Sequence, residues 1–150
     1  MRKLLTLATV LVLVVASGWP AAGRGSLEVR RPWARPGNRG ANSAIYLEIH
    51  NSGGQPDRLV SAATDVARAV ELHNTVMDRG MHRMVRVQSI AVPANGEVVL
   101  RPGGFHVMLI GLTRRLHVGD RFSLTLRFQR TGRLTVSVEV REQAGGGRTH

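Results

Sequence analysis

The feature that most constrains this fold is a series of short segments in which apolar and polar residues alternate. The clearest are 42–51, 120–129 and 133–142. Successive side chains of a β-strand point to opposite faces, so this alternation predicts strands with one buried face. Gly, Pro, Asn and Asp mark turns between about nine such segments, and none has the periodicity of a long helix. The pattern therefore predicts an all-β fold, either a sandwich or a barrel.

The length of 150 residues suits one domain with a real core. Aromatic residues make up only 4% of the chain, so we expect a core built from Val, Leu, Ala and Ile. The expected strands are 26–36, 42–51, 57–64, 67–74, 81–90, 96–102, 105–112, 120–129 and 133–142.

The N-terminal segment has the organisation of a secretory signal peptide. A basic head at 1–3 precedes an apolar run at 4–16 and small residues suited to cleavage. The run is short for a membrane span, although a retained N-terminal anchor is the alternative. We expect a signal peptide at 1–22, a folded domain at 23–142 and a disordered tail at 143–150. No cysteine is present to carry a lipid, so we expect an exported, periplasmic or extracytoplasmic protein rather than a lipoprotein.

Positive charge is the second feature of the composition. The formal net charge is +11, and without Arg2 and Lys3 the remaining cationic side chains are all arginines. These arginines are scattered along the expected strands and form no dense run, which favours a solvated surface over a nucleic-acid site. Attraction to an anionic membrane surface or an acidic partner remains an alternative.

Methionine and histidine gather in one region of the chain. Four of the five methionines and three of the six histidines lie within residues 73–108. Gap-filling methionines would be expected along the whole chain, so this clustering points to a site. The residues concerned are His73, Met77, Met81, His82, Met84, His106 and Met108.

Strand geometry brings four of them together. In the expected strand 105–112, His106 and Met108 are two apart and share a face. The turn residues around Asp78 predict a hairpin, and a turn centred between Asp78 and Arg79 makes His73 and Met84 direct cross-strand partners. A three-residue loop would shift that register by one. Docking this hairpin beside 105–112 yields a cluster of two histidines and two methionines.

The predicted cluster suits one metal ion best. Imidazole and thioether without carboxylate form a soft, neutral ligand set, which suits Cu(I). Zinc prefers Cys, His or carboxylate, and calcium and magnesium need oxygen ligands. A blue-copper site normally needs a thiolate, and this chain has no cysteine. Neutral ligands also suit handing copper on rather than storing it.

The other histidines and methionines are assigned differently. His50, His117 and His150 have no soft partner nearby in the sequence and are interpreted as ordinary residues. Met77, Met81 and His82 are either hairpin surface or auxiliary ligands.

The four residues follow the spacing His73, ten residues, Met84, twenty-one residues, His106, one residue, Met108. This spacing resembles the H-x10-M-x21-H-x-M signature of the periplasmic copper chaperones of the PCuAC type. The similarity covers the mature chain from about residue 27 to 140. Other matching stretches are WARP at 33–36, AIYLEIHNSG at 44–53, DRLVSA at 57–62, VELH at 70–73 and VVLRPGGFHVMLIGL at 98–112.

The resemblance implies a cupredoxin-like Greek-key β-sandwich with one Cu(I) held by His73, Met84, His106 and Met108. It also implies delivery of copper to the CuA centre of cytochrome c oxidase, directly or through a thiol-bearing assembly factor. We expect a monomer. The chain departs from many members at Asn74, where they carry a further methionine. Its tail has only His150, so the Cu(II) site of some relatives is not expected.

Two other functions remain open. A copper-buffering or resistance protein would use the same site to sequester the metal. A non-metal exported β-sandwich would bind an anionic partner through its arginines. No Ser/His/Asp or Cys/His arrangement favours catalysis, so we do not expect an enzyme.

Overall fold

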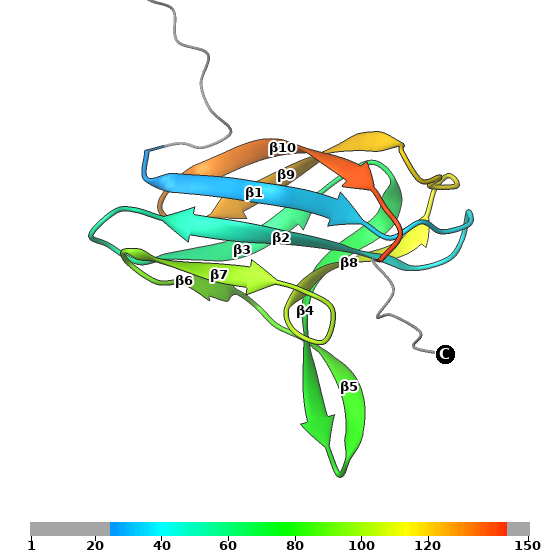
Figure 1. The fold of residues 1–150 in the computed structure, drawn as a ribbon, viewed down its shortest axis with the longest axis horizontal. Helices are drawn as coiled ribbons and strands as arrows, with labels where there is room; N and C mark the ends of the chain where they lie inside the picture. The colour runs from blue at the N-terminus through cyan, green and yellow to red at the C-terminus, as the bar shows by residue number, and fades with distance from the viewer. Residues whose placement is uncertain (1–24, 144–150) are drawn as a thin grey trace, which may run out of the picture.

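The computed structural model describes residues 25–143 (Figure 1). These residues form β-strands and turns without a helix, which confirms the all-β prediction, and so none of them forms a helix able to cross a membrane. The predicted signal peptide and tail residues 144–150 lie outside the described residues. Gln143, assigned to the tail, accepts a hydrogen bond from Arg35 at 2.7 Å. The strands are β1 (Leu27–Ala34), β2 (Ser43–Asn51), β3 (Asp57–Ala63), β4 (Ala67–Asp78), β5 (Met81–Arg86), β6 (Ile90–Val92), β7 (Gly96–Leu100), β8 (His106–Leu112), β9 (Arg121–Phe128) and β10 (Gly132–Val140).

The strands form one continuous hydrogen-bonded path in the order β5-β4-β8-β2-β1-β10-β9-β3-β6, with β7 paired to β2. The pairing of β1 with β10 is parallel, and the other strand pairs are antiparallel. The path curls on itself, because β3 also approaches β4 and β6 approaches β7. The result is a β-sandwich around one core (Figure 1).

The core follows from the alternation in the sequence. In β9 and β10, apolar side chains at every second position are buried and the polar ones between them are exposed. Leu, Val and Ile make up most of the core, together with Phe122 and Phe128. This confirms the expected aliphatic core. Hydrophobic burial contributes about 25 cal/mol per Å² of apolar surface removed from water, so these side chains are the main source of stability.

The largest departures from the expected strand bounds are in two segments. The expected strand 81–90 is divided, because β5 pairs with β4 whereas β6 crosses to pair with β3. β4 is longer than the expected 67–74 and continues to Asp78. Its first part pairs with β8 and its second part with β5, so the β4–β5 hairpin projects from the sandwich (Figure 1).

The hairpin closes with a two-residue turn. Arg79 and Gly80 both have positive φ, 49° and 78°, and they lie between the paired residues Asp78 and Met81. Positive φ at both central residues is the geometry of a type I′ turn, whose twist matches the flanking strands. Glycine reaches this conformation without steric cost, which explains its place in the turn.

A buried carboxylate ties the loop between β9 and β10 to β3. Asp57 is 6% exposed. Its Oδ1 accepts from the backbone N–H groups of Arg58 and Arg130, at 2.8 and 2.9 Å. Its Oδ2 accepts from the N–H and hydroxyl of Thr131, at 3.0 and 2.7 Å. Burial alone would raise the pKa of Asp57, but these hydrogen bonds outweigh it and hold that pKa below the ordinary value.

We predict that Asp57→Asn lowers the free energy of unfolding by about 1–3 kcal/mol at neutral pH, because an amide NH2 would face backbone donors. The lowered pKa means that the carboxylate stabilises the fold above the unfolded-state pKa of about 3.9. This stabilisation is lost as pH falls through the folded-state pKa. Urea unfolding of both proteins between pH 7 and strong acid measures the difference, which should shrink in acid. Asp65→Asn, at an exposed position, is the control.

Candidate metal centre

His73 and His106 are direct cross-strand partners. They are paired between β4 and β8, and their ring centroids lie 5.7 Å apart. His73 is also paired with Arg86 of β5, so it lies where β4 leaves the sandwich and enters the hairpin. His106 is 2% exposed, and the side chain of His73 is 15% exposed. The structure therefore confines both imidazoles to the base of the projecting hairpin.

The orientation of His106 is set by the chain just before it. Its Nδ1 donates to the carbonyl oxygen of Gly104 at 3.1 Å. A carbonyl can only accept, so this bond places the proton on Nδ1 and leaves Nε2 with a free lone pair. The same carbonyl accepts the backbone N–H of Thr75 at 3.1 Å. One oxygen thus positions both the ring and the start of the hairpin.

His73 has the opposite tautomer. Its Nε2 donates to Oε2 of Glu71 at 2.8 Å, which leaves the lone pair on Nδ1. Glu71 also lies 3.6 Å from the Arg86 guanidinium. The hydrogen bond from His73, with the nearby Arg86 charge, holds the pKa of Glu71 below its ordinary value. A carboxylate behind an imidazole is a common arrangement at metal-binding histidines.

The remaining nitrogen of each ring has no hydrogen-bond partner in the protein. Among the described residues, the buried side-chain nitrogens in this state are His73 Nδ1, His106 Nε2 and Arg35 Nε. Buried polar atoms are normally satisfied, so two such nitrogens on neighbouring rings call for an explanation. A deprotonated imidazole nitrogen is the form that binds a metal ion.

Burial also keeps His106 neutral. Desolvation of the ring lowers its pKa, and the nearby His73 and Arg35 lower it further, against the opposing effect of the Gly104 carbonyl. The neutral imidazole retains the Nε2 lone pair.

Met108 lies on the same face as the two histidines. It is two residues beyond His106 on β8 and is the cross-strand partner of Glu71. Val107 and Leu109, between and beyond them, are fully buried in the core. The expected facing of this strand is therefore confirmed. His106 is nevertheless buried on the face away from the core, where it lies beside Tyr46.

The predicted pairing of His73 with Met84 is wrong. Because the turn is centred between Arg79 and Gly80, Met84 faces Thr75. The shift relative to the prediction is two residues, so Met84 stays on the same face as His73 and becomes its diagonal neighbour. Diagonal pairs lie about 7–8 Å apart, still within reach of a long side chain. Met84 is 58% exposed.

Aromatic side chains lie beside His106 on its face of the sheet. The ring centroids of Tyr46 and His106 lie 6.2 Å apart, and those of Trp33 and Tyr46 lie 4.8 Å apart. A bulge in β1 at Arg31, where φ is 51°, brings Trp33 into register with Tyr46. The Arg35 guanidinium lies over the Tyr46 ring at 5.4 Å. This layer excludes water from His106.

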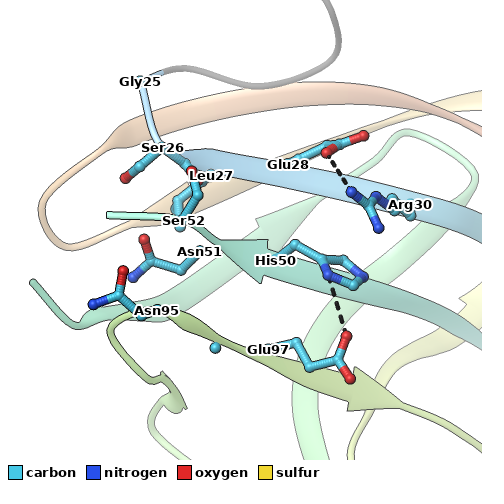
Figure 2. A pocket seen from close by; sticks show the side chains of 11 residues that line it. Gly25, Ser26, Leu27, Glu28, Arg30, His50, Asn51, Ser52, Asn95 and Glu97 are labelled. Atoms are coloured by element: carbon cyan, nitrogen blue, oxygen red, sulfur yellow. Dashed lines mark hydrogen bonds and ion pairs between the residues drawn. The ribbon is translucent and has the colours of Figure 1, made fainter. Parts of the chain in front are cut away.

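The pocket shown in Figure 2 lies elsewhere. It has a volume of about 760 Å³, is lined by residues such as Ser26, Asn51 and Asn95, and contains His50. Both ring nitrogens of His50 are engaged, Nε2 with Glu48 at 3.2 Å and Nδ1 with Glu97 at 3.1 Å. His50 therefore differs from His73 and His106, whose lone-pair nitrogens have no partner.

Two further histidines follow His106 in the sequence. His117 is 61% exposed and pairs with Asp120, while His150 lies outside the described residues. Among residues 25–143, no three His, Asp or Glu side chains are arranged to hold a metal ion without help from methionine.

Sequence reasoning missed the supporting groups of the site. Glu71 precedes His73 by two residues, so the Glu-x-His spacing was a usable signal, because it puts both side chains on the same strand face. Gly104 precedes His106 by two residues, but its role depends on a carbonyl direction that no residue type indicates. Tyr46 required knowledge of which strand lies beside β8.

Residues 27–140 match the family described as "Putative lipoprotein LpqE-like". The chain belongs to this family. The LpqE-like family is of the PCuAC type. A relative, "Putative lipoprotein Lxx21020" of Leifsonia xyli subsp. xyli, is 30% identical over 132 residues, which cover 87% of this chain and 79% of that protein. "Uncharacterized protein RP573" of Rickettsia prowazekii is 32% identical over 115 residues, 73% of this chain and 64% of that one.

Solved structures agree with the family assignment. The copper-bound PCuAC domain from PmoF2 has a TM-score of 0.68 and 27% identity, over 81% of this LpqE-like chain and 97% of that domain. The solution structure of Cu(I)-DR1885 from Deinococcus radiodurans has a TM-score of 0.63 and 33% identity, over 85% of this chain and 87% of that one. The expected PCuAC-type sandwich is confirmed.

We predict that the two histidines of this LpqE-like protein are opposite tautomers when no metal is bound. His106 should carry its proton on Nδ1 and His73 on Nε2, because each proton is held by a fixed acceptor. Long-range ¹H–¹⁵N NMR correlations at about pH 8, above the ordinary histidine pKa of about 6.5, distinguish the two forms. The exposed His82 provides an internal comparison in the same spectrum. Identical tautomers at 73 and 106 would contradict the assignment.

Proposed function

We propose that this protein is an extracytoplasmic copper chaperone that binds one Cu(I) through His73, Met84, His106 and Met108. It delivers the ion to a copper-receiving protein, for which the CuA centre of cytochrome c oxidase, reached directly or through a thiol-bearing assembly factor, is our first choice. The copper is cargo, held for transfer rather than kept.

The observation that carries the proposal is the pair of lone-pair nitrogens at the base of the hairpin. His73 Nδ1 and His106 Nε2 are buried without hydrogen-bond partners, and each ring is oriented through its other nitrogen. An imidazole held by a carboxylate or carbonyl and free at its second nitrogen is the usual form of a metal-binding histidine. Leaving two such atoms buried would otherwise cost about 1–3 kcal/mol each.

Ligand chemistry supports Cu(I) over other ions. Two imidazoles and two thioethers form a neutral, soft set that favours Cu(I). The nearest carboxylate, Glu71, is already engaged by His73 and Arg86. It therefore supports the site electrostatically as the partner of a ligand. The set contains no thiolate, so a recipient with cysteine thiolates would bind Cu(I) more tightly, which favours transfer.

Relatives support the same conclusion. One structural neighbour is copper-bound and another holds Cu(I), and both are PCuAC-type domains. The family's description and the name of one relative include the word lipoprotein, which supports a place outside the cytoplasm, although this 150-residue sequence contains no cysteine. A role in binding and transfer, without catalysis, fits these neighbours.

Cu(I) binding can be measured by competition with a chromogenic chelator under reducing, anaerobic conditions. We expect the chain from residue 23 onward to bind one equivalent tightly. His106→Ala and Met108→Ala should each weaken binding by at least about 100-fold, because removing even the outer partners of metal ligands typically costs about 10- to 100-fold.

His117→Ala is the matched control, since the His117 side chain is exposed and its ring pairs with Asp120. It should bind like the wild type. If the wild-type protein failed to compete for Cu(I), the chaperone proposal would be wrong and the arginine-rich surface would become the first place to seek a partner.

Delivery is separable from storage. We expect deletion of the gene to lower cytochrome c oxidase activity, with recovery in high external copper, because the recipient would then load without the chaperone. Re-expression of the wild type should restore activity at low copper, and the His106→Ala variant should not. Oxidase activity and growth in excess copper are measured side by side. Normal oxidase activity with increased copper sensitivity would instead assign the protein to copper buffering.

A further inference from the structure

The projecting hairpin carries a second group of soft ligands on the same face as His73. Beyond the row that contains Thr75 and Met84, the next same-face row pairs Met77 of β4 with His82 of β5. Direct cross-strand partners have Cβ atoms about 5 Å apart, and successive rows on one face are separated by about 6.7 Å. A thioether, an imidazole and a second thioether therefore lie together on this face.

These thioethers are exposed to solvent. Within residues 25–143, the large hydrophobic side chains with high exposure include Met77 at 63%, Met81 at 72% and Met84 at 58%. Five large hydrophobic residues are exposed among the described residues, and these three methionines, which lie in one short hairpin, are the majority of them. Exposed apolar side chains concentrated on a projecting element usually mark a site of interaction.

The register separates the three methionines. Met81 pairs with Asp78, on the face opposite to Met77, His82 and Met84. Arg83, on that same opposite face, lies 3.8 Å from the Asp78 carboxylate. The ion pair of the hairpin tip is thus on the face with Met81, while the face continuous with His73 presents neutral sulfur and nitrogen atoms.

Met84 lies between the two groups of ligands. It is a diagonal neighbour of His73 toward the sandwich and of Met77 toward the tip, because its row is between theirs. Methionine has three flexible side-chain bonds, so its sulfur can reach either neighbour.

We propose an outer Cu(I) site formed by Met77, His82 and Met84, through which copper enters and leaves the inner site. The proposal rests on the proposed function, since it adds a second position to the same pathway. Met84 is the ligand common to both positions. Two thioethers and one imidazole form a soft, neutral set that suits Cu(I), and the exposure of the outer site makes it accessible to a donor or recipient protein.

Transfer between the positions is ligand exchange alone. The bonds from copper to Met77 and His82 break as bonds to His73, His106 and Met108 form, while the bond to Met84 persists. Copper remains Cu(I), all of these ligands stay neutral, and no electron or proton needs to move.

Two measurements test the outer site. In the first, the double variant His106→Ala/Met108→Ala, which lacks half of the inner site, is titrated anaerobically with Cu(I) and followed by NMR of ¹³C-methyl-labelled methionines. We expect a residual, weaker equivalent that shifts the methyl signals of Met77 and Met84 and leaves that of Met81 unchanged. Adding Met77→Leu to this variant should abolish the residual binding.

In the second measurement, stopped-flow mixing with a Cu(I)–chelator complex follows loading of the otherwise wild-type protein. Met77→Leu and His82→Gln should slow loading on the order of tenfold, at the lower end of effects seen when groups that support a metal site are removed. The equilibrium affinity of the inner site should stay unchanged. Met81→Leu, matched in exposure and chemistry, should load at the wild-type rate.

The outcomes separate this proposal from the proposed function. One tight equivalent in the wild type, with no residual binding in the inner-site variant and equal loading rates in all three hairpin variants, would overturn the outer site and leave the chaperone intact. Equal slowing by Met81→Leu and Met77→Leu would also overturn it, because a face-specific site cannot depend on Met81. Absence of any Cu(I) binding by the wild type would overturn both.

Discussion

The pairing of β4 with β8 is the constraint on which the whole site depends. It sets His73 opposite His106, and it ends at that pair because β8 begins at His106. Beyond this point β4 has only β5 as a partner, so the chain leaves the sandwich as a two-stranded ribbon. The Gly104 carbonyl accepts from Thr75 on the ribbon and from the ring of His106. Ring orientation and ribbon direction are therefore set by the same atom.

The charges around the two histidines are few for a chain with a formal net charge of +11. The two imidazoles are hydrogen-bonded through opposite ring nitrogens, and burial lowers the pKa of His106. The closest arginine on the hairpin, Arg86, is paired with Glu71. The Arg35 guanidinium, which lies over the Tyr46 ring, adds positive charge beside His106, whereas the negative charge of Glu71 acts through His73.

The sequence could predict the faces of the site but not its register. Alternation in the strand around His106 correctly placed Met108 beside it and the intervening Val107 in the core, because strand periodicity is a local property. The turn of the hairpin was ambiguous, since Asp78, Arg79 and Gly80 allow more than one pair of central residues. The observed turn shifts the pairing by two residues, which preserves every face. A shift of one would have moved Met84 to the other face.

What the sequence could not supply were the long-range contacts. Tyr46 lies beside His106 only because β2 pairs with β8, and Trp33 reaches Tyr46 only through the bulge in β1. The division of the expected strand 81–90 has the same cause, since β5 and β6 pair with strands at opposite ends of the sheet path. Local pattern shows which residues are buried, whereas partner choice depends on how the whole path closes.

The hairpin methionines show how folding and function separate in this chain. A two-stranded ribbon outside the sandwich is marginally stable by itself, and apolar side chains that remain exposed there add little to the core. Each cross-strand row of the face continuous with His73 nonetheless contains at least one side chain that suits Cu(I), from Met77 and His82 near the tip to His73 at the base. On the opposite face, Asp78 and Arg83 supply the charged surface expected of an exposed strand edge. Solvent contacts both faces, so exposure alone does not account for the imidazole of His82 and the thioethers of Met77 and Met84 on one face, where the proposed copper sites lie.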